Sequence, residues 1–175
     1  MLQQTGTTYG MSAVNADWRQ LYEEDATVLL RYLAKLTGDR EIASELMQET
    51  FVRAIQANPA FVTAGSPHAW LFRTATNLAR NELRRRRLFA FVPFTGAERA
   101  RTGLFDIEAN QVRAALRSLP FDQAATLLLH YHSGFHRDEI AEMHGISEEA
   151  VKSRLARGRK SFIAAYRRIE RGLAR

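Results

Sequence analysis

Apolar residues recur at intervals of three and four along most of this chain, and no other sequence feature constrains its fold as strongly. Such spacing gathers apolar side chains on one face of an α-helix, where they can be buried. No segment shows a convincing two-residue alternation, and no repeat of roughly 20–50 residues is visible. The sequence therefore predicts an all-α fold. The clearest stripe, within residues 17–36, comprises Trp18, Leu21, Tyr22, Val28, Leu29, Tyr32, Leu33 and Leu36.

Glycine and proline divide this pattern into separate helices. Gly38 ends the first predicted helix, and a second runs from about residue 40 to 57. Ser66 is placed to cap a third helix, which extends to about residue 87 and has Pro67 in its first turn. Four further helices are expected at about residues 112–119, 124–131, 137–144 and 148–171.

The helical periodicity fails between residues 88 and 108, a stretch that contains Pro93, Gly96 and Gly103. We therefore expect two small helical domains joined by a flexible linker, each marginal in size alone. Apolar residues in the linker could dock on a domain or a partner. The expected boundaries are a disordered tail at 1–14, a first domain at 15–87, the linker at 88–108 and a second domain at 109–175.

The composition indicates a globular protein with a polyanionic partner. Of 175 residues, 46% are apolar and 25% charged, which is enough apolar mass for packed cores. The net charge of +6 favours a nucleic acid or another polyanion. No apolar run reaches the roughly 18 residues that span a bilayer, and the N-terminus lacks the basic and apolar regions of a secretory signal. We expect a cytoplasmic protein, with Met1 or Met11 as its start.

The residue inventory argues against an enzyme. The chain has no cysteine, which excludes disulfides, thiolate metal sites and cysteine nucleophiles. It also has no glycine-rich phosphate loop, no paired catalytic carboxylates and no GxSxG motif, so we expect no cofactor. The candidate metal ligands are His130, His132 and His136. Residues two apart on a helix point apart, so we expect no metal site there.

One face of the third predicted helix carries arginines together with an aromatic residue and an amide. Guanidinium groups bind phosphates in a bidentate manner, an indole can stack on a base, and an amide can pair with a base edge. The preceding loop, residues 58–65, could close over an extruded base. The alternative is a solvated arginine face. The candidate residues are Ser66, Trp70, Arg73, Asn77, Arg80 and Arg84.

A helix-turn-helix pattern follows in the second domain. The predicted helix at 137–144 ends at Gly145, and Ser147 caps the next one. That last helix would bury Val151 and Leu155 and expose a cationic face, with nine basic and one acidic residue between Val151 and Arg175. Such a helix can enter the major groove. The alternative is a helical hairpin with a basic tail. The candidate residues are Lys152, Ser153, Arg154, Ala156, Arg157 and Lys160.

The second predicted helix has a polar, acidic outer face. DNA would avoid such a face, so it is available to a basic protein partner, although acidic faces are usually just solvated. The residues on it include Glu41, Glu45, Gln48, Glu49 and Arg53.

Three blocks resemble the bacterial sigma-70-type initiation factors of the extracytoplasmic-function (ECF) group. ELMQETFVRA, residues 45–54, resembles the helix that binds the clamp of core RNA polymerase. AWLFRTATNLARNELRRR, residues 69–86, resembles the helix that melts and reads the minus-ten element. LRSLP at 116–120, together with residues 138–142 and 145–160, resembles the domain that reads the minus-thirty-five element. The order and spacing of the three blocks are those of the family.

The resemblance implies a protein that binds core RNA polymerase through clamp and flap, directs it to promoter DNA and helps to open it. It also implies an anti-sigma factor as partner. The alternative is a stand-alone helix-turn-helix regulator, which would leave the first domain unexplained. Departures from the family pattern, such as Asn81, His136 and Ala156, concern which promoter is read. The implied polymerase-binding residues are Glu45, Leu46, Gln48, Glu49 and Arg53.

Overall fold

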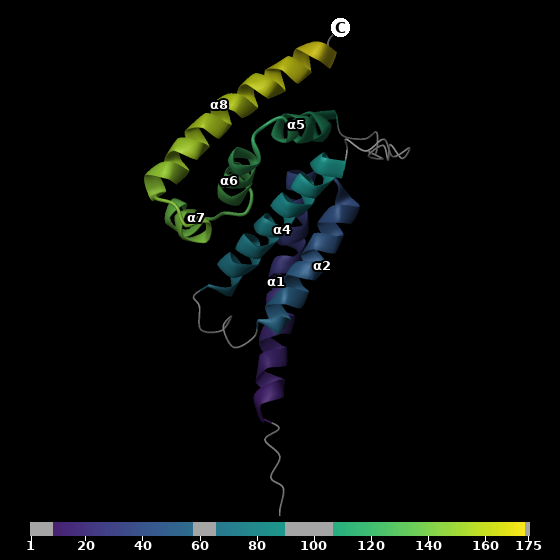
Figure 1. Cartoon of the computed structure of the whole chain (residues 1–175), viewed down its shortest axis with the longest axis vertical. Helices are drawn as coiled ribbons and strands as arrows, with labels where there is room; N and C mark the ends of the chain where they lie inside the picture. Colours follow the sequence, from purple (N-terminus) through teal and green to yellow (C-terminus); the bar gives the residue numbers. More distant parts are fainter. Residues whose placement is uncertain (1–8, 58–65, 90–106, 174–175) are drawn as a thin grey trace, which may run out of the picture.

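The computed structural model describes residues 9–57, 66–89 and 107–173, and within these ranges the regular secondary structure is entirely helical. The all-α fold is therefore confirmed. Figure 1 shows the arrangement of the helices. Their bounds are α1 Tyr9–Thr37, α2 Arg40–Gln56, α4 Pro67–Phe89, α5 Ile107–Arg117, α6 Phe121–Tyr131, α7 Arg137–His144 and α8 Glu148–Leu173.

Helix α1 begins at Tyr9, so residues 9–14 are helical although they were expected to belong to a disordered tail. A helix needs only hydrogen bonds along its own backbone, so it can extend beyond the apolar stripe that revealed it. The other end agrees with the prediction. Gly38 adopts φ 75°, which an L side chain rarely adopts, and its N–H donates to the Ala34 carbonyl at 3.0 Å.

The first half of the molecule consists of α1, α2 and α4, packed side by side (Figure 1). Leu29 and Leu33 of α1 and Leu71 of α4 are completely buried between them. Tyr32 is buried as well, and its hydroxyl lies 2.7 Å from Thr76 Oγ1. Because burial removes the water that would stabilise a phenolate, the pKa of Tyr32 is raised. The phenol therefore stays neutral and ties α1 to α4.

The second half consists of α5 to α8, and α8 is its longest helix (Figure 1). Val151 and Leu155 of α8 are buried, as the sequence predicted. Gly158 lies where α8 crosses α6, and a Cβ atom there would be 3.1 Å from the Leu127 side chain. Glycine therefore lets the two helices approach closely, which outweighs its poor helix propensity.

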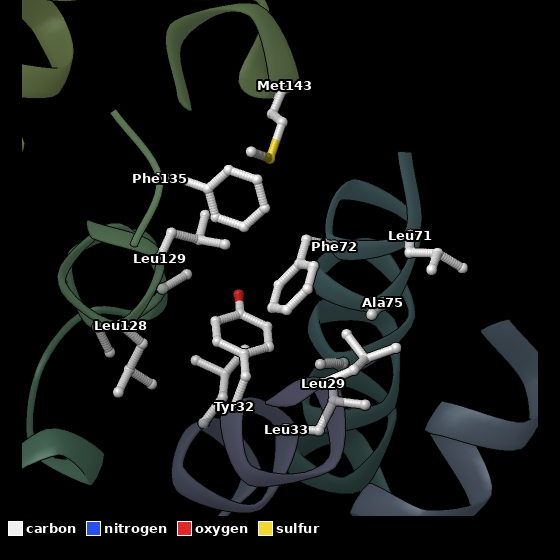
Figure 2. Packing of buried hydrophobic residues seen from close by; sticks show 14 of the residues in the cluster. Leu29, Tyr32, Leu33, Leu71, Phe72, Ala75, Leu128, Leu129, Phe135 and Met143 are labelled. Carbon is white, nitrogen blue, oxygen red and sulfur yellow. The ribbon is translucent and has the colours of Figure 1, made fainter. Parts of the chain in front are cut away.

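The two halves share one hydrophobic core (Figure 2). Phe135 is 2% exposed, and its ring centroid lies 5.0 Å from that of Phe72 in α4. It also stacks on His68, at 4.7 Å between centroids. The sequence predicted the helices of both halves but not this contact between them. The linker expected at 88–108 lies mostly outside the described residues, so the domain boundaries stay predictions.

Candidate nucleic-acid interface

Helix α4 begins as its sequence predicted. Ser66 Oγ accepts a hydrogen bond from the Ala69 N–H at 3.3 Å, and Pro67 occupies the first turn. This cap places Trp70 in the second turn. The loop at 58–65, which we expected to close over an extruded base, lies outside the described residues.

The burial pattern of α4 separates a packed face from a cationic one. Phe72, Ala75 and Thr76 face the core, and the Thr76 hydroxyl donates to the Phe72 carbonyl at 2.6 Å. With that face fixed, the other side of the helix turns outward. The predicted DNA-binding residues form this "arginine face of α4": Ser66, Arg73, Asn77 and Arg84 are exposed, and Trp70 and Arg80 are half-buried.

Arg80 contacts two residues in the second half of the molecule. Its Nη2 donates to Asp122 Oδ1 of α6 at 2.7 Å, and its guanidinium lies 5.1 Å from the centre of the Phe121 ring. Asn77 Oδ1 accepts from Arg80 Nη1 at 3.4 Å. An arginine predicted to bind phosphate is thus paired with a carboxylate of the same chain.

The N-terminal half of the arginine face borders a pocket of about 120 Å³. The wall on the α4 side includes Ser66, Trp70 and Arg73, and the opposite wall is Glu139, Glu142 and Met143 of α7. The first helix of the helix-turn-helix therefore lies over the residues that we expected to contact the minus-ten element.

Glu82 neutralises part of the arginine run near the end of α4. It accepts from Arg86 Nε at 2.8 Å and from Arg85 Nη2 at 2.7 Å. The hydrogen bond from Arg86, followed by that from Arg85, lowers the pKa of the Glu82 carboxyl despite its burial. Arg84 and Arg87 have no such partner among the described residues, so they remain available to phosphates.

The helix-turn-helix has the geometry that its sequence predicted. Gly145 ends α7 with φ 61°, and the Ile146 N–H donates back to the Ala141 carbonyl at 3.0 Å. Ser147 Oγ then accepts from the Ala150 N–H at 3.2 Å and caps α8. Glu139 Oε2 accepts from the His136 N–H at 2.7 Å, so a carboxylate stabilises the start of α7.

The basic face of α8 is open to solvent at nearly every position. Burial of Val151 and Leu155 fixes the rotation of the helix and turns this face outward. Arg154 is half-buried, and its charge is one of the causes that lower the pKa of His144, after burial and Arg80. The remaining members, all exposed, are Lys152, Ser153, Ala156, Arg157 and Lys160.

The outer face of α2 exposes most of the residues that the resemblance assigned to polymerase binding. Glu45, Gln48, Glu49 and Arg53 are exposed, and Arg53 Nε donates to Glu49 Oε1 at 2.7 Å. Leu46 differs from them, and its role in polymerase binding stays a prediction. Its side chain is buried in the core of the first half and does not belong to this face.

Sequence reasoning missed an apolar part of the same face. Val52 and Ile55 of α2 are 46% and 56% exposed, and Tyr22 of α1 is 49% exposed. The Tyr22 ring packs against Phe51, which is itself buried. Val52 and Ile55 do not lie on the buried apolar stripe of α2. Apolar residues outside that stripe were the sequence signal that could have predicted this exposed patch. We define the outer face of α2 as Glu45, Gln48, Glu49, Val52, Arg53 and Ile55.

The histidines take part in packing and hydrogen bonds within the described residues. His130 Nδ1 lies 2.8 Å from the Phe135 carbonyl oxygen, and His68 Nδ1 contacts Asp25 Oδ1. No group of three or more histidine, aspartate or glutamate side chains is arranged to hold a metal within the ranges the structure covers. Over the same ranges, every helix is too short or too polar to cross a membrane.

The chain matches two family models in the order of its two halves. Residues 21–89 match sigma-70 region 2, and residues 109–162 match sigma-70 region 4. The structure resembles that of the sigma factor RpoE from Bartonella quintana, solved with the anti-sigma factor NepR: the TM-score is 0.72, the identity 22%, and the match covers 86% of this chain and 97% of that one. CnrH, solved with the cytosolic domain of CnrY, gives a TM-score of 0.68 at 24% identity, over 86% of this chain and 87% of that one.

Curated proteins give the same result at higher identity. The ECF RNA polymerase sigma factor SigL of Mycobacterium tuberculosis is 36% identical over 145 residues, which is 78% of this chain and 81% of SigL. The ECF RNA polymerase sigma factor EcfG of Rhodopseudomonas palustris is 31% identical over 142 residues, 78% of this chain and 77% of EcfG. With matches of this identity across both halves, the chain belongs to the ECF group of RNA polymerase sigma factors.

Proposed function

We propose that this ECF sigma factor binds core RNA polymerase with the outer face of α2 and reads promoter DNA with two helices. The arginine face of α4 reads and helps to open the minus-ten element, and the basic face of α8 reads the minus-thirty-five element. In this assignment, residues 15–87 and 109–175 are the two functional domains. The observation that carries the proposal is the presence of these two cationic faces, one in each family-matched half, beside one acidic and apolar face.

The arginine face of α4 has the chemistry that strand opening requires. A melted base exposes its face and its pairing edge, which aromatic and amide side chains can recognise. Trp70 and Asn77 supply these two groups, about two turns apart on the same side of α4. Arg73 lies between them and Arg84 lies two turns beyond Asn77, and both offer charges for the phosphates of the separated strand.

The basic face of α8 has the chemistry of double-stranded readout. The first turns of a recognition helix contact base edges in the major groove, and later cations follow the phosphates. Arg157 and Lys152 are exposed on these first turns. Ala156 between them presents only a methyl group, which suits apolar contact with a thymine methyl.

The outer face of α2 suits a protein partner rather than DNA. Glu45 and Glu49 repel phosphate, and Val52 and Ile55 leave apolar side chains in water. A partner that buries the apolar pair and pairs with the carboxylates would gain from both effects. Because the chain belongs to the ECF sigma factors, we assign core polymerase as this partner.

A second protein partner is an anti-sigma factor. The structures of RpoE and CnrH were determined with NepR and with the cytosolic domain of CnrY, respectively. We extend this class of partner to the present chain as part of the proposal, along with a non-enzymatic role in the cytoplasm, where the promoters are. A stand-alone operator-binding regulator is not favoured, because it leaves the sigma-70 region 2 match and the face of α2 without a role.

The polymerase surface can be tested by charge reversal on α2. Glu45→Lys/Glu49→Lys should lower the amount of chain that co-purifies with core polymerase, because both charges lie on the proposed contact. Asp138→Lys/Glu170→Lys is the matched control, since it reverses two exposed carboxylates elsewhere. Equal recovery of both double variants would overturn the assignment of this face.

A further inference from the structure

Asp25 is a buried acidic residue that belongs to neither of the cationic faces nor to the outer face of α2. It lies in α1, and its side chain is only 8% exposed. Burying a carboxylate costs free energy unless a partner replaces the water that it loses. Within the described residues that partner is His68 of α4, whose Nδ1 contacts Asp25 Oδ1. The pair therefore ties α1 to α4.

His68 lies at the start of the helix that carries the minus-ten candidates. It is in the first turn of α4, two positions after Ser66 and two before Trp70. A carboxylate can only accept a hydrogen bond, so Nδ1 of His68 carries the hydrogen in this contact. The His68 ring also packs on Phe72, with 4.9 Å between the ring centroids. These two contacts fix the orientation of His68 and hold the first turn of α4.

We propose that Asp25 and His68 are positioning residues for reading of the minus-ten element. Asp25 holds His68, which in turn holds the first turn of α4. Trp70, in the next turn, then meets the separated strand in a fixed place. Neither member of the pair touches DNA, because residues two apart point to different sides of a helix, and Trp70 is on the DNA side. This proposal rests on the proposed function, since it takes the arginine face of α4 to be the minus-ten reader.

The start of α4 needs a directional contact more than its middle does. The first N–H groups of a helix have no partners within it, and helix ends fray. The Ser66 cap supplies one hydrogen bond, to the Ala69 N–H at 3.3 Å. Among the described residues, the next polar tie between α1 and α4 is Tyr32 to Thr76, about two turns further along α4. The first turn therefore relies on the Asp25–His68 pair.

Apolar packing alone does not fix this position. Leu71 and Phe72 are completely buried and hold α4 against the core. Apolar attraction, however, has no preferred direction, whereas a hydrogen bond holds two atoms at a defined distance and angle. Apolar burial thus stabilises α4, and the Asp25–His68 pair sets its register against α1.

A buried pair of this kind is a weak source of stability. The cost of taking both groups out of water offsets much of their attraction, and apolar replacements of similar size are often neutral or stabilising. Stability therefore does not account for a carboxylate and an imidazole between α1 and α4. For the same reason, substitution can separate the position of α4 from the stability of the chain.

Asp25→Leu/His68→Phe replaces the pair by apolar side chains of similar size. Urea denaturation should give a midpoint no lower than that of the parent chain. The functional readout is binding of holoenzyme to DNA that is single-stranded over the minus-ten element of a promoter it transcribes, compared with the same DNA altered in that element. The preference for the unaltered DNA should fall about three- to tenfold, the range of one lost hydrogen bond. His68→Phe alone keeps the ring on Phe72 and should lower the preference equally.

Two further variants serve as controls. Tyr32→Phe/Thr76→Val removes the other polar tie between the same helices while keeping the side-chain shapes, and it should change the preference less than twofold. Asp25→Asn keeps an oxygen that can accept from His68 Nδ1, so it should retain the parent's preference within twofold. A loss in Asp25→Asn as large as that in the double variant would contradict positioning by this hydrogen bond.

The outcomes distinguish the positioning role from the function on which it rests. If both pair variants keep the parent's preference, or lose no more of it than Tyr32→Phe/Thr76→Val does, the positioning role is wrong and the proposed function stands. If the parent holoenzyme binds both DNAs equally well, α4 does not read the minus-ten element and the positioning role fails with it. Loss of preference in both pair variants, with both controls unchanged, supports the positioning role.

Discussion

The arginine face of α4 and the basic face of α8 carry similar side chains in opposite surroundings. On α8, five of the six predicted contacts are exposed, and the buried side of the helix holds them outward. On α4, Arg80 is paired with Asp122, and the Trp70 end borders α7. The local sequence therefore determines which side chains a helix face carries. Whether those side chains are exposed depends on which distant helix packs against that face.

The largest expected effect comes from removing the ring that joins the halves. Phe135→Ala should lower the free energy of unfolding by about 3–5 kcal/mol, because it leaves a cavity beside Phe72. Urea denaturation measures this loss. Tyr131→Ala, at a ring that is 59% exposed, is the control and should change stability by about 0.5 kcal/mol or less. If both substitutions lowered the free energy of unfolding equally, Phe135 would not be packed against α4 as the structure shows.

The orientation of α8 depends on a close helix crossing. Gly158→Val should destabilise the second half by about 1–3 kcal/mol, because new atoms would press on Leu127. Gly172→Val makes the same change where a Cβ atom meets nothing within 4 Å, so only helix propensity is affected. Thermal denaturation of the two variants compares them, and equal melting temperatures would count against the tight crossing.

Because the basic face of α8 is exposed, we expect a substitution on it to weaken promoter recognition directly. Arg157→Ala should weaken holoenzyme binding to its promoter by about 1–3 kcal/mol if it contacts a base edge, and less if it contacts only phosphate. Competition binding against a promoter altered at the minus-thirty-five element measures the difference. Arg168→Ala removes an exposed arginine outside the basic face, and an equal loss there would indicate general charge attraction instead.

Removing the exposed amide of Asn77 in α4 should cause a smaller defect, limited to selection of the minus-ten element. Asn77→Ala should reduce minus-ten selection by about 0.5–1.5 kcal/mol, the net value of a typical hydrogen bond. Binding to core polymerase should not change, because Asn77 lies on the opposite side of α4 from the packed residues. Permanganate footprinting of the opened strand reads the effect. Loss of polymerase binding would give Asn77 a structural role.

Two histidines should make the stability of the folded chain weakly dependent on pH. Burial lowers the pKa of His144, with added repulsion from Arg80 and Arg154, and burial together with Lys35 and Arg31 lowers that of His132. An unfolded histidine titrates near about 6.5, so below that pH the unfolded chain binds more protons than the folded one. Stability should fall as pH drops from 7.5 to 5.5. His132→Asn/His144→Asn should flatten that slope, which denaturation at both pH values would reveal.

Much of the fold was predictable because its signals are local. Apolar spacing, Gly38, Gly145 and the serine caps each act within a few residues, and the structure contains the helices that they predicted. The helix-turn-helix and the outward rotation of α8 follow from the same short-range rules. For this reason the side-chain classes on both cationic faces could be read directly from the sequence.

The docking of the two halves could not be predicted in the same way. It depends on Phe135 meeting Phe72 across 63 positions of the chain, and no periodic pattern encodes such a meeting. Asp122 belongs to none of the motifs in the sequence, yet it pairs with Arg80. The role of Leu46 stays a prediction for a related reason, since its side chain is buried and a motif match does not tell a contact residue from its buried neighbour.

Run-off transcription tests the central claim most directly. Purified chain and core polymerase, incubated with genomic fragments, should give discrete transcripts that neither component produces alone. The start sites should share sequence near positions minus ten and minus thirty-five. A chain that does not associate with core polymerase, or that binds duplex DNA tightly and specifically without it, would contradict the account.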